Sequence, residues 1–227
     1  MPTPLEPTVG LAVLHLFCKV APLADAEAVT AAITDAANDG VQVVPVALLG
    51  HKADLGVMAL GADLWRLREM QTALMQAGLD LVDSYVSLTE LSEYSQGVPD
   101  EMKAARLRPN LPPEGKTAFC FYPMSKRRGE TANWFTLPYD DRKDLMYAHG
   151  TSGRKFAGRI LQVVTGSTGI DDFEWGVTLF GVHPDDLKDV VYTMRFDEAS
   201  ARYAEFGPFY AGMVATLPEV LTAVGLD

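Results

Sequence analysis

The chain has 227 residues and a formal net charge of −11, and 48% of its residues are hydrophobic. This length and composition are typical of one large or two small globular domains and exclude a disordered chain. The acidic balance argues against nucleic-acid binding. The N-terminal apolar run 11–18 is too short to span a bilayer and contains His15. We therefore expect a cytoplasmic protein without a membrane span.

The first half of the chain predicts the element order β-α-β-β-α-β. Helices are expected at 24–38 and from Asp63 to about Ala77, because acidic residues lie at the start of each run and a glycine follows it. Apolar and β-branched runs predict the strands at 10–20, 41–49, 54–60 and 81–91. Residues 1–98 should therefore form an N-terminal ferredoxin-like domain.

The same order repeats after a linker at 99–116, which is rich in Pro and Lys/Arg and contains a short helix at 101–107. Residues 117–227 predict strands at 117–122, 157–166, 173–182 and 201–206, and helices at 140–148, 185–194 and 208–224. The repeat predicts an α+β chain of two ferredoxin-like halves that face one another as in a dimeric α/β barrel. The second half would form the C-terminal domain.

Charge is distributed unevenly along the chain. Residues 1–100 hold four Lys/Arg against thirteen Asp/Glu, whereas residues 103–159 hold twelve Lys/Arg against five Asp/Glu. A basic segment inside an acidic protein favours a small polyanionic ligand over a long polymer, although a solvated charged face would give the same pattern.

The run 119–128 changes from an aromatic strand to a cation cluster, and this change marks a candidate site. Tyr122 ends the strand, Pro123 follows, and Lys126 opens three consecutive cations. Such a segment can place a phenol beside the positive charge that binds a carboxylate. The ordinary alternative is a strand aromatic with a satisfied hydroxyl, followed by solvated cations.

His149 is the candidate metal ligand. It precedes Gly150 at the end of a predicted helix, where a histidine also favours the helix dipole without any ligand role. No second His, Asp or Glu stands at helical spacing, which disfavours a zinc or non-haem iron cage and leaves haem, which needs one axial ligand. Cys18 and Cys120 predict buried free thiols. Gln162, in an apolar strand, lies either on the polar face or buried against a ligand.

These residues resemble the coproheme decarboxylases of the chlorite dismutase superfamily, in the runs 122–128, 133–138, 149–154, 171–180 and 194–207. The resemblance implies a homopentamer with the porphyrin in the C-terminal domain. The implied reaction is the hydrogen-peroxide-dependent oxidative decarboxylation of two propionates of iron coproporphyrin III (coproheme), which gives haem b. Two alternatives stay open: a chlorite dismutase-like peroxidase, and a non-catalytic haem-binding or haem-sensing protein.

The resemblance also implies roles for individual residues. His149 would be the proximal iron ligand, and Tyr122 would be oxidised to a radical that takes a hydrogen atom from a propionate. Lys126 would place the second reactive propionate, and Gln162 would lie on the distal face of the iron, where chlorite-cleaving members are expected to carry arginine. The remaining carboxylate contacts would come from Arg106, with Arg108 as a close competitor, from Ser200, and from the backbone of Tyr122, Pro123, Met124, Ser125 and Lys126.

Overall fold

The structure, a computed structural model, describes residues 2–226. Its N-terminal half has the predicted order, with β1 (Ala12–Val20), α1 (Ala26–Asn38), β2 (Gln42–Leu48), β3 (Leu55–Gly61), α2 (Leu64–Gln76) and β4 (Leu79–Thr89). The side chains of Asp25 and Asp63 accept hydrogen bonds from backbone N–H groups in the first turns of α1 and α2. These two caps fix where the helices begin.

The C-terminal half repeats that order with additions. Helix α3 (Asp100–Leu107) precedes it in the predicted linker. The half itself contains β5 (Ala118–Lys126), η1 (Trp134–Thr136), α4 (Tyr139–Arg154), β6 (Ile160–Gly166), β7 (Trp175–Gly181), α5 (Pro184–Met194), α6 (Glu198–Ala201), β8 (Ala204–Phe206), β9 (Tyr210–Val214) and α7 (Leu217–Ala223).

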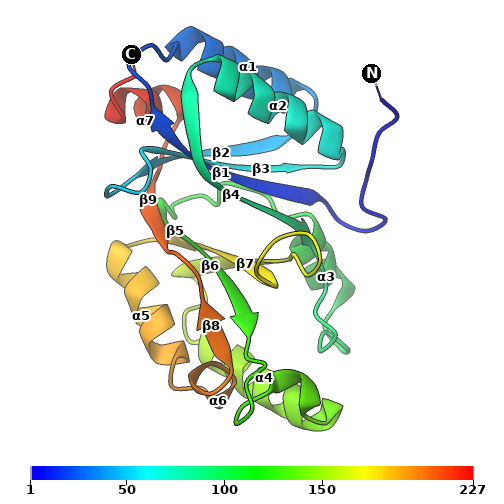
Figure 1. The fold of residues 1–227 in the computed structure, drawn as a ribbon. Helices are drawn as coiled ribbons and strands as arrows, with labels where there is room; N and C mark the ends of the chain where they lie inside the picture. Colours follow the sequence, from blue (N-terminus) through cyan, green and yellow to red (C-terminus); the bar gives the residue numbers. More distant parts are fainter. Residues whose placement is uncertain (1, 227) are drawn as a thin grey trace.

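The strands of both halves join into one barrel. The N-terminal strands run in the order β4-β1-β3-β2, and the C-terminal strands in the order β6-β7-β5, with β8 and β9 along the free edge of β5. β9 also pairs with β2, and β6 pairs with β4, so the ring of strands is continuous. Figure 1 shows α1, α2 and α7 outside the N-terminal strands and α4, α5 and α6 at the opposite end. The expected α+β fold of two ferredoxin-like halves is confirmed.

Strand β1 is buried on both faces because it lies between the helices and the barrel interior. Leu14 and Leu16 pack toward the N-terminal helices, whereas Val13 and Phe17 pack inside the barrel. His15 also lies inside, 1% exposed, with Nε2 3.0 Å from the Thr178 hydroxyl. Burial lowers the pKa of His15 to about 3, so its ring is neutral. His15 is therefore a core residue.

Two predicted helices differ from the structure in their bounds. The closing helix at 208–224 is interrupted by strand β9, and only Leu217–Ala223 is helical. β9 forms because its backbone groups find partners on both β2 and β5, which outweighs local helix propensity. The helix predicted to end near Gly150 continues to Arg154.

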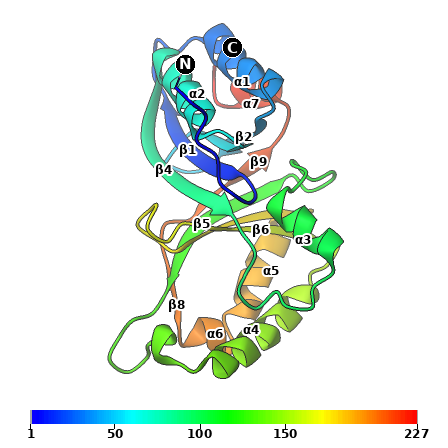
Figure 2. The ribbon, with the colours of Figure 1, turned by 90° about the vertical axis from the view of Figure 1, so that its right-hand side faces the viewer.

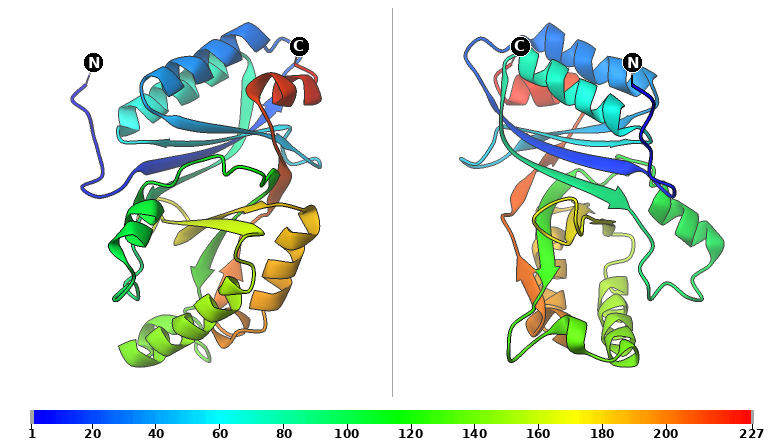
Figure 3. Two further views of the ribbon diagram at one scale, coloured as in Figure 1. Left: turned by 180° about the vertical axis from the view of Figure 1, so that it is seen from behind. Right: turned by 45° about the vertical axis from the view of Figure 1, so that its right-hand side comes forward.

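The end of the chain returns to the N-terminal half. Val220 and Leu221 of α7 belong to the same buried cluster as Val29 of α1, and Figure 3 shows the two helices side by side. Within residues 2–226, no helix is both long and apolar enough to cross a membrane.

Candidate functional site

The corresponding helices of the two halves, α1 and α4, pack differently on their strands. α1 buries Val29, Ala32, Ile33 and Ala36 against the sheet, whereas α4 buries none of its residues. α4 packs mainly on α5 and α6, and Figures 1 and 2 show it at the far end of the C-terminal half. Part of the helix-facing side of the C-terminal sheet is therefore left without a helix over it.

Strand β6 carries the exposed part of that sheet face. Gln162 and Val164 are exposed, Val164 by 42%. They pair with Leu179 and Val177 of β7, which belong to the buried cluster under α5. Paired residues of antiparallel strands project to the same side, so Gln162 and Val164 face the helix layer. We call this exposed surface at Gln162 and Val164 the uncovered face.

Tyr122 lies on the same side of the sheet as the uncovered face. It pairs with Val177, which in turn pairs with Val164, so the three residues form one row across β5, β7 and β6. Tyr122 is 7% exposed, and within the described residues its hydroxyl has no hydrogen-bond partner. Burial raises the pKa of this phenol well above its usual value of 10.0, so the phenol stays protonated.

Lys126 is a buried cation at the end of β5, 8% exposed. Its Nζ donates to the Ala199 carbonyl at 2.6 Å and lies 4.4 Å from the centre of the Trp134 ring. Within residues 2–226 no carboxylate oxygen lies within 4.0 Å of this nitrogen. Burial lowers its pKa from 10.5 to about 8, partly opposed by Glu174. This buried cation thus has no anionic partner beside it among the described residues.

His149 lies in the interior of α4, so the sequence-based alternative of a histidine in the last helical turn is wrong. Its Nδ1 is 3.3 Å from Asp197 Oδ2 and 3.5 Å from the Ser200 hydroxyl. The pKa of His149 is lowered by burial first and by Lys126 second, with Asp197 opposing both. A neutral imidazole with a carboxylate beside Nδ1 leaves Nε2 suited to bind a metal.

Helix α6 links the histidine to the cation cluster. Ala199, which accepts from Lys126, directly precedes Ser200, which lies beside His149. The structure thus brings together Tyr122, Lys126, His149 and Ser200 around one side of the C-terminal sheet. Among residues 2–226, no group of three or more His, Cys, Asp or Glu side chains could hold a metal ion.

The other predicted residues are placed as follows. Pro123 is buried, and Met124 packs at the edge of the cluster that holds Tyr122. The Ser125 hydroxyl accepts from the Glu174 backbone N–H at 3.2 Å. Arg106 lies in the last turn of α3, exposed, and makes no hydrogen bond or ion pair with the other site residues in the part of the chain described.

Sequence reasoning assigned no role to three residues that shape the site. Glu174 is a buried carboxylate that accepts from the Lys126 backbone N–H at 2.8 Å and from Arg128 at 2.5 Å, which fixes the turn after β5. Trp134 lies under Lys126, and Asp197 lies beside His149. Glu174 and Asp197 reach their partners from distant parts of the chain, so no local pattern signals these contacts.

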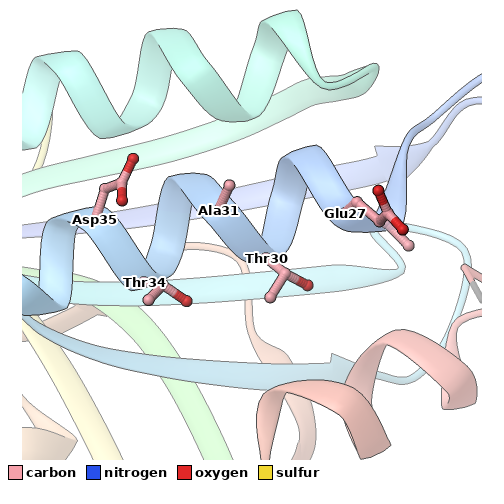
Figure 4. A pocket seen from close by; sticks show the side chains of 6 residues that line it. Glu27, Thr30, Ala31, Thr34 and Asp35 are labelled. Atoms are coloured by element: carbon pink, nitrogen blue, oxygen red, sulfur yellow. The ribbon is translucent and has the colours of Figure 1, made fainter.

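A shallow depression on the N-terminal half lies apart from this site. It follows the outer side of α1 and is lined by Ala26, Glu27, Thr30, Ala31, Thr34 and Asp35, as Figure 4 shows. Its short side chains include no histidine, cysteine or cation, so it offers none of the chemistry that gathers around His149.

Comparisons with known proteins identify one family over most of the chain. The sequence profile of the family described as chlorite dismutase matches residues 23–215. A coproheme decarboxylase of Staphylococcus saprophyticus subsp. saprophyticus is 46% identical over 74% of this chain and 71% of its own length. One of Staphylococcus carnosus (strain TM300) is 47% identical over 76% of this chain and 72% of its own length.

Solved structures show the same fold. A haem-binding protein from Thermus thermophilus is 35% identical, with a TM-score of 0.84 over 100% of both chains. A chlorite dismutase from Candidatus Nitrospira defluvii, in complex with imidazole, is 17% identical, with a TM-score of 0.77 over 96% of both chains. From the matched profile and the identity to these relatives, the chain belongs to the chlorite dismutase family.

Proposed function

We propose that this chain is a coproheme decarboxylase, which removes two propionate carboxyl groups from iron coproporphyrin III with hydrogen peroxide and yields haem b. The two relatives that carry this name are 46% and 47% identical to it. The substrate combines a flat apolar ring, four carboxylates and one iron atom. The site offers an uncovered sheet face, a buried cation and one neutral imidazole, which match these three features in kind.

The buried ammonium group of Lys126 is the observation that carries the proposal. A charge removed from water destabilises a protein unless an opposite charge lies beside it. Among residues 2–226, Lys126 Nζ donates to a carbonyl and lies over the Trp134 ring but meets no carboxylate, and burial already lowers its pKa to about 8. A propionate carboxylate would supply the missing charge and form a charge-assisted hydrogen bond. A porphyrin with four propionates therefore suits this site better than an uncharged ligand.

The other candidates take complementary roles in this proposal. His149 binds the iron, and Gln162 faces the ring from the uncovered face. Ser200, Ser125 and the backbone of 122–126 bind propionates, and Arg106 binds one at the rim. A neutral amide at Gln162 donates a hydrogen bond but lacks the guanidinium charge that would stabilise an anionic oxygen leaving chlorite. The site therefore favours decarboxylation over chlorite cleavage.

Tyr122 carries the hydrogen-atom transfer. Bound iron and hydrogen peroxide supply the oxidising chemistry. Tyr122 loses its phenolic hydrogen atom and then takes one from the propionate chain, and loss of one more electron releases carbon dioxide and leaves a vinyl group. Each propionate thus loses two electrons, which reduce one hydrogen peroxide to water. Because burial raises the pKa of Tyr122, the phenol keeps the hydrogen atom that this exchange requires.

The decisive experiment follows product mass after hydrogen peroxide is added to the protein loaded with iron coproporphyrin III. The wild type should lose two carboxyl groups per porphyrin. Tyr122→Phe should bind the porphyrin equally well but decarboxylate it at least about 100-fold more slowly. Tyr192→Phe, at an exposed tyrosine on α5, is the matched control. Normal turnover by Tyr122→Phe would rule out the radical role, and rapid oxygen release from chlorite would favour a chlorite-degrading enzyme.

The metal ligand has its own test. His149→Ala should bind porphyrin with a changed iron absorbance spectrum, because the axial nitrogen is gone. A spectrum identical to that of the wild type would remove His149 as the ligand.

The assembly and location are part of the same proposal. We propose a homopentamer in the cytoplasm, with residues 1–98 and 117–227 as its two domains and 99–116 as the linker. Light scattering coupled to size-exclusion chromatography measures the number of chains directly.

A further inference from the structure

The edge of β5 beside Tyr122 contains a bulge. β5 pairs with β8 at Met124 and Phe206, and with β9 at Phe121 and Tyr210. Tyr122 and Pro123 of β5 thus stand opposite three residues, 207–209, which connect β8 to β9. One extra residue in an edge strand re-aims the side chains next to it.

Specific contacts hold this bulge in place. Gly207 donates its N–H to the Pro123 carbonyl at 2.8 Å, and a Cβ at Gly207 would lie 2.6 Å from the Pro123 ring and 2.7 Å from Phe173. Only glycine fits there without movement. From the N-terminal half, Lys52 Nζ donates to the Phe209 carbonyl at 2.6 Å. The bulge is therefore fixed from both halves of the barrel.

The bulge places one aromatic ring flat against Tyr122. The Phe209 ring centre is 4.5 Å from that of Tyr122, with an angle of 24° between the planes, and Phe206 meets Tyr122 edge-on at 5.5 Å and 70°. Phe209 is 38% exposed and Phe206 44% exposed, so neither serves mainly to fill the core. The Tyr122 hydroxyl has no hydrogen-bond partner among residues 2–226, so packing sets the orientation of this phenol: the buried cluster that contains Val177 and the rings of Phe206 and Phe209.

We propose that Phe209 is a positioning residue, which stacks on Tyr122 and holds the phenol in the plane and rotamer from which its hydroxyl meets the substrate propionate. This inference rests on the proposed role of Tyr122 in hydrogen-atom transfer. Transfer of a hydrogen atom depends steeply on the distance and direction between the two reacting groups, so a phenol free to turn would react more slowly.

The first test measures the ring without any porphyrin. In the full-length, porphyrin-free chain with ring-labelled tyrosine, NMR reports the flip rate of Tyr122, whose signals are assigned with Tyr122→Phe. Phe209→Leu keeps an apolar side chain but removes the flat ring, and should raise the flip rate at least about tenfold. Phe209→Tyr should retain the slow flip. Tyr192→Leu, at an exposed aromatic that does not touch Tyr122, should leave the rate unchanged.

The second test measures turnover of coproheme. Phe209→Leu should lower kcat by about 10- to 100-fold with KM within about twofold of the wild type, and Phe209→Tyr should restore kcat. If Phe209→Leu leaves the flip rate unchanged, the positioning role is overturned, whatever happens to kcat. A faster flip with an unchanged kcat overturns it as well. Full activity of Tyr122→Phe would instead overturn the proposed radical role of Tyr122, while the flip rate would still report whether Phe209 orients the ring.

Discussion

The buried ammonium group of Lys126 should make the stability of the porphyrin-free chain depend on pH. Its pKa falls from 10.5 to about 8 because burial penalises the charged form more than Glu174 favours it. Lys126→Met removes the charge and keeps an unbranched apolar side chain of similar length. The variant should therefore lose the pH dependence that this one group contributes.

The sign and size of the effect follow from the two pKa values. The unfolded chain holds the proton up to the ordinary pKa of 10.5, whereas the folded chain releases it near 8. Between these values the unfolded state binds more protons, so the free energy of unfolding rises with pH. Each pKa unit corresponds to about 1.4 kcal/mol. Between about pH 7 and about pH 9.5, Lys126 should thus add about 2 kcal/mol.

Urea unfolding of the porphyrin-free wild type and Lys126→Met at these two pH values measures the effect. The wild type should gain about 2 kcal/mol more than the variant as the pH rises. Lys143→Met, at an exposed lysine on α4, should follow the wild type. If wild type and Lys126→Met changed in parallel, Lys126 would not be a penalised buried cation, and the charge argument for a carboxylate ligand would fail.

Three further substitutions test the fold and the uncovered face. Val164→Trp should abolish porphyrin binding in an absorbance titration but barely change the thermal midpoint of the porphyrin-free chain, because Val164 is 42% exposed; retained binding would place the porphyrin elsewhere. Gly212→Ala should destabilise the barrel by about 3 kcal/mol in urea unfolding, because the new Cβ would overlap the Ala47 carbonyl oxygen of β2. An unchanged urea midpoint would mean that β2 and β9 separate at little cost. Thr178→Val should cost about 1–3 kcal/mol in the same assay by leaving His15 Nε2 without its partner, and an unchanged midpoint would mean that water replaces the hydroxyl.

The order of elements could be predicted because local signals coincide with the fold. Asp25 and Asp63 accept hydrogen bonds as helix caps, as their positions before apolar periodic runs indicate. β9 could not be predicted, because Tyr210–Val214 is only five residues long, and Ala211 and Met213 suit a helix as well as Tyr210 and Val214 suit a strand. It becomes a strand only by pairing with β2, which lies in the other half of the chain. Tertiary pairing overrides propensity at such a junction.

The candidate site could likewise be predicted only where its signal is local in sequence. The phenol and the cation of 119–128 are adjacent in sequence, so their pattern pointed to a carboxylate ligand. The environment of His149 is non-local, because Asp197 and Ser200 reach it from another part of the chain. Gly150 indicated a helix end, but a glycine costs only about 1 kcal/mol inside a helix. The helix continues past Gly150 because its last turn packs, with Phe156 buried just beyond α4.

The two halves share one topology, but the corresponding helices α1 and α4 differ in the residues on their inner sides. This difference separates the packed N-terminal core from the candidate site in the C-terminal half. The inner side of α1 carries Val29 and Ile33, which pack on the sheet and close it. The corresponding side of α4 carries His149, Ser152 and Gly153. His149 contacts α6 and the residue just before it, Ser152 contacts that same residue, and Gly153 lies near α5. Short and polar side chains cannot bury enough apolar surface to hold a helix against a sheet. The same choice of residues therefore opens the uncovered face and places beside it the imidazole that we propose as the iron ligand, so one local change accounts for both the space and the proposed chemistry.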